Sequence, residues 1–174
     1  DAEVVAVKVP PAPTSEDLFR RATRERSAFA SVQSPHLVAL YDAGQQDEVF
    51  FYAMEYLPEG SLAAGRHERT TVVSAVADAS RAANSLHEAG IVHRDIKPQN
   101  VLLYAGGAKL ADLGLSHVLA PGVTVTGMGS VTSIEYTDPA LIHGAAPSRA
   151  TEIFSLGATL PPALSGHGLY GALP

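Results

Sequence analysis

The stretch LPEGS, residues 57–61, divides the chain into two parts with different local patterns. Before it, short runs rich in Val, Phe and Tyr are separated by Pro, Gly and Asp, which is typical of strands joined by turns. After it, apolar residues recur at helical spacing. We therefore expect a two-lobed α+β chain, with a small β-rich lobe containing one helix in residues 1–56, a hinge at 57–61, and a mainly helical lobe in 62–174.

Three strands and one helix are expected in the first part. VVAVKV, residues 4–9, is a β-branched run interrupted by PPAP, so it predicts a strand that ends at a proline break. HLVALYDAG and QQDEVFFYAMEY, which together cover 36–56, predict two more strands joined by a polar turn. Between the first of these three strands and the second we expect a helix over 14–32, with Ser15 as its N-cap.

The clearest helix of the second part is predicted over residues 70–89. Gly90 follows it and is the expected C-cap, because glycine adopts the left-handed backbone that ends many helices. The apolar face of this helix is expected to consist of Val73, Val76, Ala77, Ala83 and Leu86.

The rest of the second part is predicted from shorter signals. IVH, NVLLY and AKLADL, within residues 91–112, read as short strands. Residues 114–138 are rich in Gly, Ser and Thr without an apolar period, which predicts a long exposed loop. TEIFSLGATL begins a buried helix that Pro161 and Pro162 should stop, because proline lacks the amide donor that a helix interior needs.

Composition restricts partners and location. The 174 residues are 46% hydrophobic, yet no window approaches the ~18 apolar residues of a membrane helix. A net charge of −6 offers no basic stripe to a nucleic acid, and the absence of Cys fits a reducing compartment. We expect a cytoplasmic segment without membrane contact, whose parent chain could be membrane-tethered. Because Asp1 precedes a strand already in progress, we also expect a piece of a longer chain.

HRDIKPQN, residues 93–100, concentrates groups that suit phosphate and metal chemistry. Asp95 could accept a hydroxyl proton, and Lys97 could neutralise charge that develops on a transferring group. Asn100 and Asp112 offer hard oxygen ligands of the kind that Mg²⁺ prefers. The alternative is a polar turn that Pro98 and Asn100 only punctuate.

Lys8 lies in the middle of an apolar strand, where an ammonium group needs a partner. Glu25 on the following helix could supply it. Taken alone, Lys8 could instead extend its charge to solvent, and Glu25 could belong to the solvated charged face of RATRER.

Three motifs in this order resemble the protein kinase family, most closely its bacterial Ser/Thr type. VAVK (5–8) is similar to the V-A-I-K of strand three, HRDIKPQN (93–100) to the H-R-D-x-x-x-x-N catalytic loop, and DLG (112–114) to D-F-G. The resemblance covers roughly residues 4–160. It implies a small antiparallel lobe with one helix, a helical lobe, ATP and Mg²⁺ as cofactors, and transfer of a phosphoryl group to a protein Ser or Thr.

The resemblance also assigns residues to phosphate and metal binding. Lys8 would hold the α- and β-phosphates, with Glu25 paired to it. Asn100 and Asp112 would hold the Mg²⁺ ions against the phosphates.

For the chemical step, the resemblance assigns Asp95 to orient and deprotonate the substrate hydroxyl. Lys97 makes the loop similar to the Ser/Thr-specific form of the family. Arg94, before the catalytic Asp, implies control by a phosphate on the activation loop, with possible autophosphorylation in trans. The candidate acceptors are Thr124, Thr126, Ser130, Thr132 and Ser133.

Adenine binding is assigned in the same way. Met54 falls at the gatekeeper position, and Glu55 and Leu57 fall in the hinge whose backbone meets the base. Ala6 above and Leu102 below would sandwich the purine. The residues at the family's hydrophobic column are Phe29, Leu40, His93 and Leu113.

The chain departs from the family pattern at several positions. The glycine-rich loop before VAVK and the later helices are missing, so we expect an incomplete domain, truncated at both ends. Ala140 replaces the glutamate of A-P-E. Glu152 stands where the family has an Asp that steadies the catalytic loop, and its extra methylene predicts a looser grip.

Two other functions are compatible with the pattern. A pseudokinase-like scaffold would bind nucleotide or partners without turnover, although Lys8, Asp95 and Asp112 are all retained. A small-molecule phosphotransferase of similar fold would keep the same motifs, but Arg94 and Lys97 favour a protein substrate. GHGLYG (166–171) and HEAGIVH (87–93) only mimic a phosphate loop and a zinc site, because each lacks the helical context that its motif requires.

Overall fold

In the computed structural model, residues 4–9, 31–46, 49–112 and 131–168 are described. Most of the helix predicted over 14–32 lies outside these ranges. Site residues outside them are Glu25, Phe29, Leu113, Thr124, Thr126 and Ser130. Within the described ranges, no helix combines the length and the apolar character needed to cross a bilayer.

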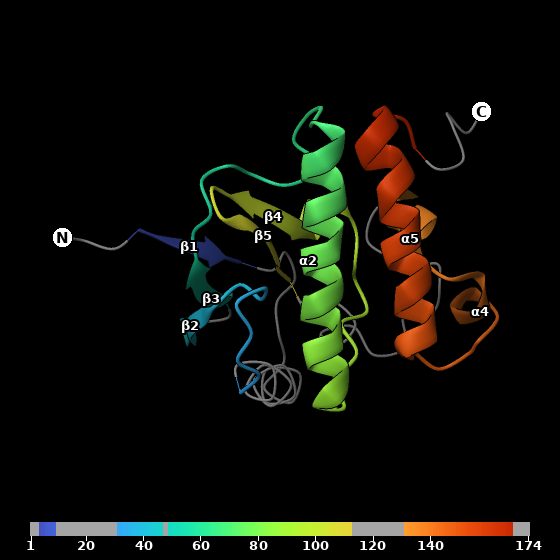
Figure 1. The fold of residues 1–174 in the computed structure, drawn as a ribbon. Helices are drawn as coiled ribbons and strands as arrows, with labels where there is room; N and C mark the ends of the chain where they lie inside the picture. The colour runs from blue at the N-terminus through green and yellow to red at the C-terminus, as the bar shows by residue number, and fades with distance from the viewer. Residues whose placement is uncertain (1–3, 10–30, 47–48, 113–130, 169–174) are drawn as a thin grey trace.

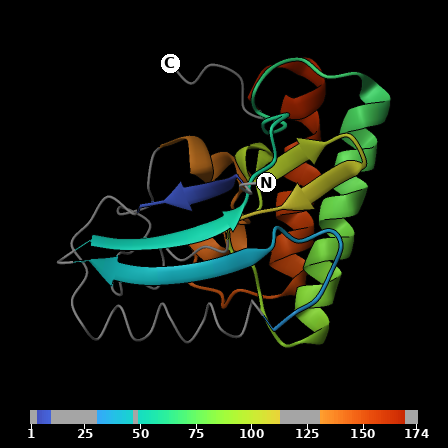
Figure 2. The same ribbon diagram turned by 90° about the vertical axis from the view of Figure 1, so that its left-hand side faces the viewer.

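The first part forms a three-stranded antiparallel sheet, with the order β1-β3-β2. Its strands are β1 (Val5–Lys8), β2 (Leu40–Gln46) and β3 (Val49–Glu55). The strand predictions from VVAVKV and from residues 36–56 are therefore confirmed. Figures 1 and 2 show this sheet to one side of two long helices.

Helix α2 (Arg69–Glu88) confirms the main helix of the second part. Val76, Ala83 and Leu86 of its predicted apolar face are buried, but Val73 is 50% exposed while Val72 is fully buried. One residue step turns a side chain by about 100° around a helix, so a one-residue error moves it off the buried face. Gly90 has the expected positive φ of 74°, and the amide of Ile91 donates to the Leu86 carbonyl at 2.9 Å.

A β-hairpin follows, formed by β4 (Val101–Tyr104) and β5 (Gly107–Leu110). Ser61 of the predicted hinge bridges to Leu102, so this segment runs beside the hairpin. The prediction of a strand at IVH (91–93) is wrong, because these residues have no ladder partner within the described ranges. The two other strand predictions of this region are confirmed.

Three further helices complete the described chain: η3 (Val131–Tyr136, a 3₁₀ helix), α4 (Pro139–Ile142) and α5 (Arg149–Ser165). Residues 131–136 correct the predicted loop over 114–138, of which 114–130 lies outside the described ranges. Helices α2 and α5 lie side by side in Figures 1 and 2 and are in contact.

The prediction that Pro161 and Pro162 stop the last helix is wrong. α5 continues through both prolines to Ser165, and Figure 1 shows it as one unbroken helix. Each proline removes one backbone hydrogen bond, the one to the carbonyl four residues earlier. Leu160 packs against the core and Ala163 is 7% exposed, so tertiary contacts stabilise the helix on both sides of the prolines.

The core is a cluster of buried side chains between α2, the β4–β5 hairpin and α5. Alanines of α2 form much of it, which allows the hairpin to approach the helix closely. The fully or nearly fully buried members include Leu62, Val72, Leu86, Val101 and Leu110. This core supports the loop of residues 93–100, which connects α2 to the hairpin.

Candidate active site

The loop of residues 93–100 holds three predicted site residues in one hydrogen-bonded cluster. Lys97 Nζ lies 2.9 Å from Asp95 Oδ1. Asn100 Nδ2 donates to the backbone oxygen of Asp95 at 2.7 Å and to its Oδ2 at 2.9 Å. Pro98 opens the 3₁₀ helix η1 (Pro98–Asn100), where its missing amide needs no partner, and the short helix returns Asn100 to Asp95.

His93 ties this loop to the residues that follow β5. It is fully buried, and its Nδ1 accepts a hydrogen bond from the Asp95 amide at 3.3 Å. Nε2 therefore carries the proton and donates to the Ala111 carbonyl at 3.0 Å. The Ala111 amide donates in turn to the Asn100 carbonyl at 2.8 Å. Burial lowers the pKa of His93, against the raising effect of nearby carboxylates such as Glu152, so the ring is neutral.

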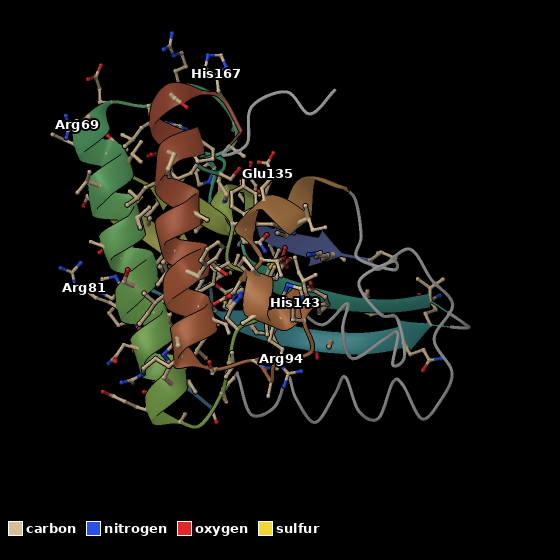
Figure 3. All side chains as sticks on the ribbon, turned by 90° about the vertical axis from the view of Figure 1, so that its right-hand side faces the viewer. Arg69, Arg81, Arg94, Glu135, His143 and His167 are labelled. Carbon is tan, nitrogen blue, oxygen red and sulfur yellow. The ribbon has the colours of Figure 1, made fainter. Side chains whose placement is uncertain are left out.

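Glu152 of α5 binds the backbone of the loop from the other side. Its Oε1 accepts from the Arg94 amide at 2.6 Å, and its Oε2 lies 2.5 Å from His87 Nε2. Arg149 Nε donates to His87 Nδ1 at 3.2 Å, so the imidazole donates to Glu152 through Nε2. Both carboxylate oxygens are thus engaged, and the predicted looser grip is not observed. Arg94 itself is exposed and lies near the N-terminal end of α5 in Figure 3.

Lys8 and Asp112 meet between the sheet and the helical part. Lys8 Nζ forms an ion pair with Asp112 Oδ2. Asp112 has a positive φ of 57°, a conformation that aspartate tolerates better than most residues. Glu25, the predicted partner of Lys8, lies outside the described ranges, so that pairing stays a prediction.

Tyr52 also binds Asp112, and the sequence reasoning missed it. Its hydroxyl donates to Asp112 Oδ1 at 3.0 Å. Burial first, and then the negative charge of Asp112 and this hydrogen bond, raise the pKa of Tyr52 far above its usual range. The phenol is therefore a hydrogen-bond donor at physiological pH. The signal in the sequence was a tyrosine within the apolar run VFFYAM, but its partner is 60 residues away.

The residues predicted to surround adenine come from both parts of the chain. Ala6 and Met54 are cross-strand partners in the sheet, and both are half-buried. Leu57 follows β3 and is half-buried, while Leu102 lies on β4. Of the predicted hydrophobic column, Leu40 packs against the buried ring of Tyr52.

The side chain of Glu55 joins the end of β3 to β5. Lys109 Nζ donates to Glu55 Oε1 at 2.7 Å and to Oε2 at 2.8 Å. The Ala39 amide also donates to Oε2 at 3.1 Å. The carboxylate of Glu55, a predicted hinge residue, is therefore held from both sides. The expected contact of the Glu55 backbone with adenine stays a prediction.

The donors at Asn100 and Asp112 fit a magnesium site that a nucleotide would complete. Among the residues that the structure describes, no three His, Asp or Glu side chains gather as a metal cage. Mg²⁺ is commonly held by one or two carboxylates together with waters and phosphate oxygens, so a full protein cage is not required. The Asn100 amide nitrogen donates to Asp95, which leaves its amide oxygen as the acceptor for a cation.

The small antiparallel sheet, the helical part and the polar loop between them define a protein-kinase-like α+β fold. The sequence model of the protein kinase domain matches residues 1–172. The chain belongs to the protein kinase family.

Curated relatives are bacterial enzymes. The serine/threonine-protein kinase PrkC of Bacillus subtilis is 31% identical over 158 residues, which cover 87% of this chain and 24% of PrkC. The serine/threonine-protein kinase PknB of Mycobacterium leprae is 31% identical over 176 residues, covering 94% of this chain and 28% of PknB. PknK of Mycobacterium tuberculosis, also named a serine/threonine-protein kinase, is 33% identical over 174 residues, with 95% of this chain and 16% of PknK covered. The chain spans about a quarter of the length of the first two relatives.

Proposed function

We propose that this chain is the core of a Ser/Thr protein kinase, which transfers the γ-phosphoryl group of ATP to a Ser or Thr hydroxyl of a protein. The observation that carries the proposal is the cluster of Asp95, Lys97 and Asn100. Membership of the protein kinase family supports it. The acceptor is a Ser or Thr of a protein substrate or of a second copy of this chain.

In the chemical step, Asp95 orients the acceptor hydroxyl and takes its proton as the oxygen bonds to the γ-phosphorus. The bond from that phosphorus to the β–γ bridging oxygen breaks, and ADP leaves. Lys97, 2.9 Å from Asp95, neutralises negative charge that develops on the transferring group. Because such transfer depends on positioning and electrostatics, few residues can carry it.

Phosphate and metal binding belong to the strand lysine and the two oxygen donors. Mg²⁺, held by Asn100 and Asp112, would neutralise charge on the phosphates. Lys8 would exchange its ion pair with Asp112 for the α- and β-phosphates, with Glu25 as its second partner.

Adenine would bind between residues from the two parts of the chain. In this proposal Ala6 and Leu102 cover the two faces of the base, Met54 limits the depth of the pocket, and the backbone of Glu55 and Leu57 meets its edge. In the same proposal, residues 1–56 form the small lobe, residues 62–174 form the helical lobe, and residues 57–61 form the hinge between them.

Intact mass after incubation with ATP and Mg²⁺ tests the proposal. The wild type should gain one or more phosphate groups, and Asp95→Asn should gain none at the same protein concentration. Asp42→Asn is the matched control, because Asp42 is an exposed aspartate on β2 whose side chain accepts from the neighbouring Ala43 amide, and it should gain phosphate as the wild type does. Peptide mapping would then locate the acceptors among Thr124, Thr126, Ser130, Thr132 and Ser133.

A wild type that gains no phosphate on itself or on a generic protein substrate would contradict the proposal. If it still bound ATP, it would be a nucleotide-binding module without turnover. Equal phosphate gain by the wild type and Asp95→Asn would contradict the role of Asp95.

A further inference from the structure

Tyr52 lies directly beside the lysine and aspartate of the site. On the sheet, Lys8 of β1 pairs in register with Tyr52 of β3. Both side chains reach Asp112, one through the ammonium group and the other through the phenol. The contact of Tyr52 could not be derived from the motifs, because Tyr52 belongs to none of them.

The two oxygens of Asp112 differ in how firmly they are held. Oδ2 is paired with Lys8, whose side chain is 44% exposed and can move to another partner. Oδ1 accepts from Tyr52, which is 5% exposed and packed by Leu40, Ala43 and Met54. The ring of Tyr52 therefore stays in place while Lys8 changes partners.

Carboxylates that bind metals usually accept a hydrogen bond on the oxygen that faces away from the metal. Such a bond fixes the orientation of the carboxylate, and its loss typically lowers metal affinity by about 10- to 100-fold. In this chain the phenol of Tyr52 is in position to give that bond to Oδ1 of Asp112, leaving Oδ2 to face a cation once Lys8 departs.

We propose that Tyr52 is a positioning residue that orients the Asp112 carboxylate for Mg²⁺ in the nucleotide complex. The inference rests on the proposed function and adds a residue to its metal site. Tyr52 acts through Asp112 and does not touch the nucleotide or the acceptor.

Metal binding by Tyr52→Phe tests the inference, because the substitution removes the hydroxyl and keeps the buried ring. The probe is Mn²⁺, whose free concentration is followed by its electron paramagnetic resonance signal in the presence of a non-hydrolysable ATP analogue. We expect the dissociation constant for Mn²⁺ to rise about 10-fold or more. Tyr41→Phe is the matched control, since Tyr41 is half exposed on the neighbouring strand, and it should bind Mn²⁺ as the wild type does.

A second measurement separates positioning from a general structural effect. Binding of a fluorescent ATP analogue in excess chelator, without metal, should be the same for the wild type and Tyr52→Phe. Equal Mn²⁺ affinity of the two proteins, or tighter binding by Tyr52→Phe, would overturn this inference and leave the proposed function intact. A wild type that binds no Mn²⁺ with the analogue would overturn both.

Discussion

Two site residues hold a backbone conformation that residues other than glycine rarely adopt. Arg94 has φ 70° and Asp112 has φ 57°. Such conformations cost about 1–3 kcal/mol each and persist where the surroundings hold them. The Arg94 amide is held by the buried carboxylate of Glu152, and the Asp112 side chain is held by Lys8 and Tyr52. The strain is thus located on the two loops that carry the proposed chemistry.

Glu152→Gln should destabilise the protein by about 1–3 kcal/mol, because the amide has one acceptor where the carboxylate has two. Either the Arg94 amide or His87 would then face an NH₂ group instead of an oxygen. Chemical unfolding in urea measures the change. Glu88→Gln on the exposed face of α2 is the control and should change stability by less than about 0.5 kcal/mol. Equal stability of Glu152→Gln and the wild type would show that the two hydrogen bonds do not fix the loop.

At the scale of elements, α5 combines favourable ends with an unfavourable interior. A capping box joins Ser148 and Thr151 at its start, and Gly166 ends it with a φ of 75°. Pro161 and Pro162 leave the carbonyls one turn earlier without their usual helical donors. The helix forms because its ends are satisfied and its buried face packs against α2, so local propensity alone misjudges it.

Pro161→Ala should stabilise the protein, because it restores a backbone donor in an exposed helical position. The gain should be about 1–2 kcal/mol, below the ~3 kcal/mol of a typical helix proline, since Pro162 still follows and proline also restricts the unfolded chain. Thermal unfolding measures it. Pro147→Ala, an exposed proline before the helix, is the control and should be neutral or slightly destabilising. A lower melting temperature for Pro161→Ala would mean that the proline shapes the helix end.

At the scale of the whole molecule, contacts from the sheet converge on the end of β5 and on the two residues that follow it, Ala111 and Asp112. Lys8 and Tyr52 bind Asp112, and Glu55 binds Lys109. The backbone of Leu110 also bonds the segment before β2, with the Val38 amide donating to its carbonyl at 3.0 Å. The same short segment that presents Asp112 therefore fixes the sheet relative to the helical part.

The pair of Glu55 and Lys109 should couple the two parts energetically. Both side chains are largely buried, at 21% and 18% exposed. In a double-mutant cycle of Glu55→Gln and Lys109→Met, we expect a coupling energy of about 1 kcal/mol in unfolding stability. The control cycle uses Asn84→Ala and Glu88→Gln, an exposed pair on α2 that should couple by less than about 0.5 kcal/mol. Additive effects for the first pair would show that it contributes nothing to the attachment of the sheet.

The sequence by itself determined the strands before residue 56, the helix near 70–89 with its Gly90 end, and the grouping of Asp95, Lys97 and Asn100. Each of these is encoded within a few neighbouring residues, as alternation, helical spacing or a short polar motif. Local patterns report local conformation well because the interactions behind them are short in sequence.

Only the tertiary structure decided how these pieces meet. Tyr52 reaches Asp112 across 60 residues, and Glu55 reaches Lys109 across 54. The course of α5 through its prolines and the absence of a strand at residues 91–93 depend on packing against other elements in the same way. Such contacts follow from the register of strands and from burial, which no single segment contains, because the free energy that stabilises them comes from surfaces far apart in the chain.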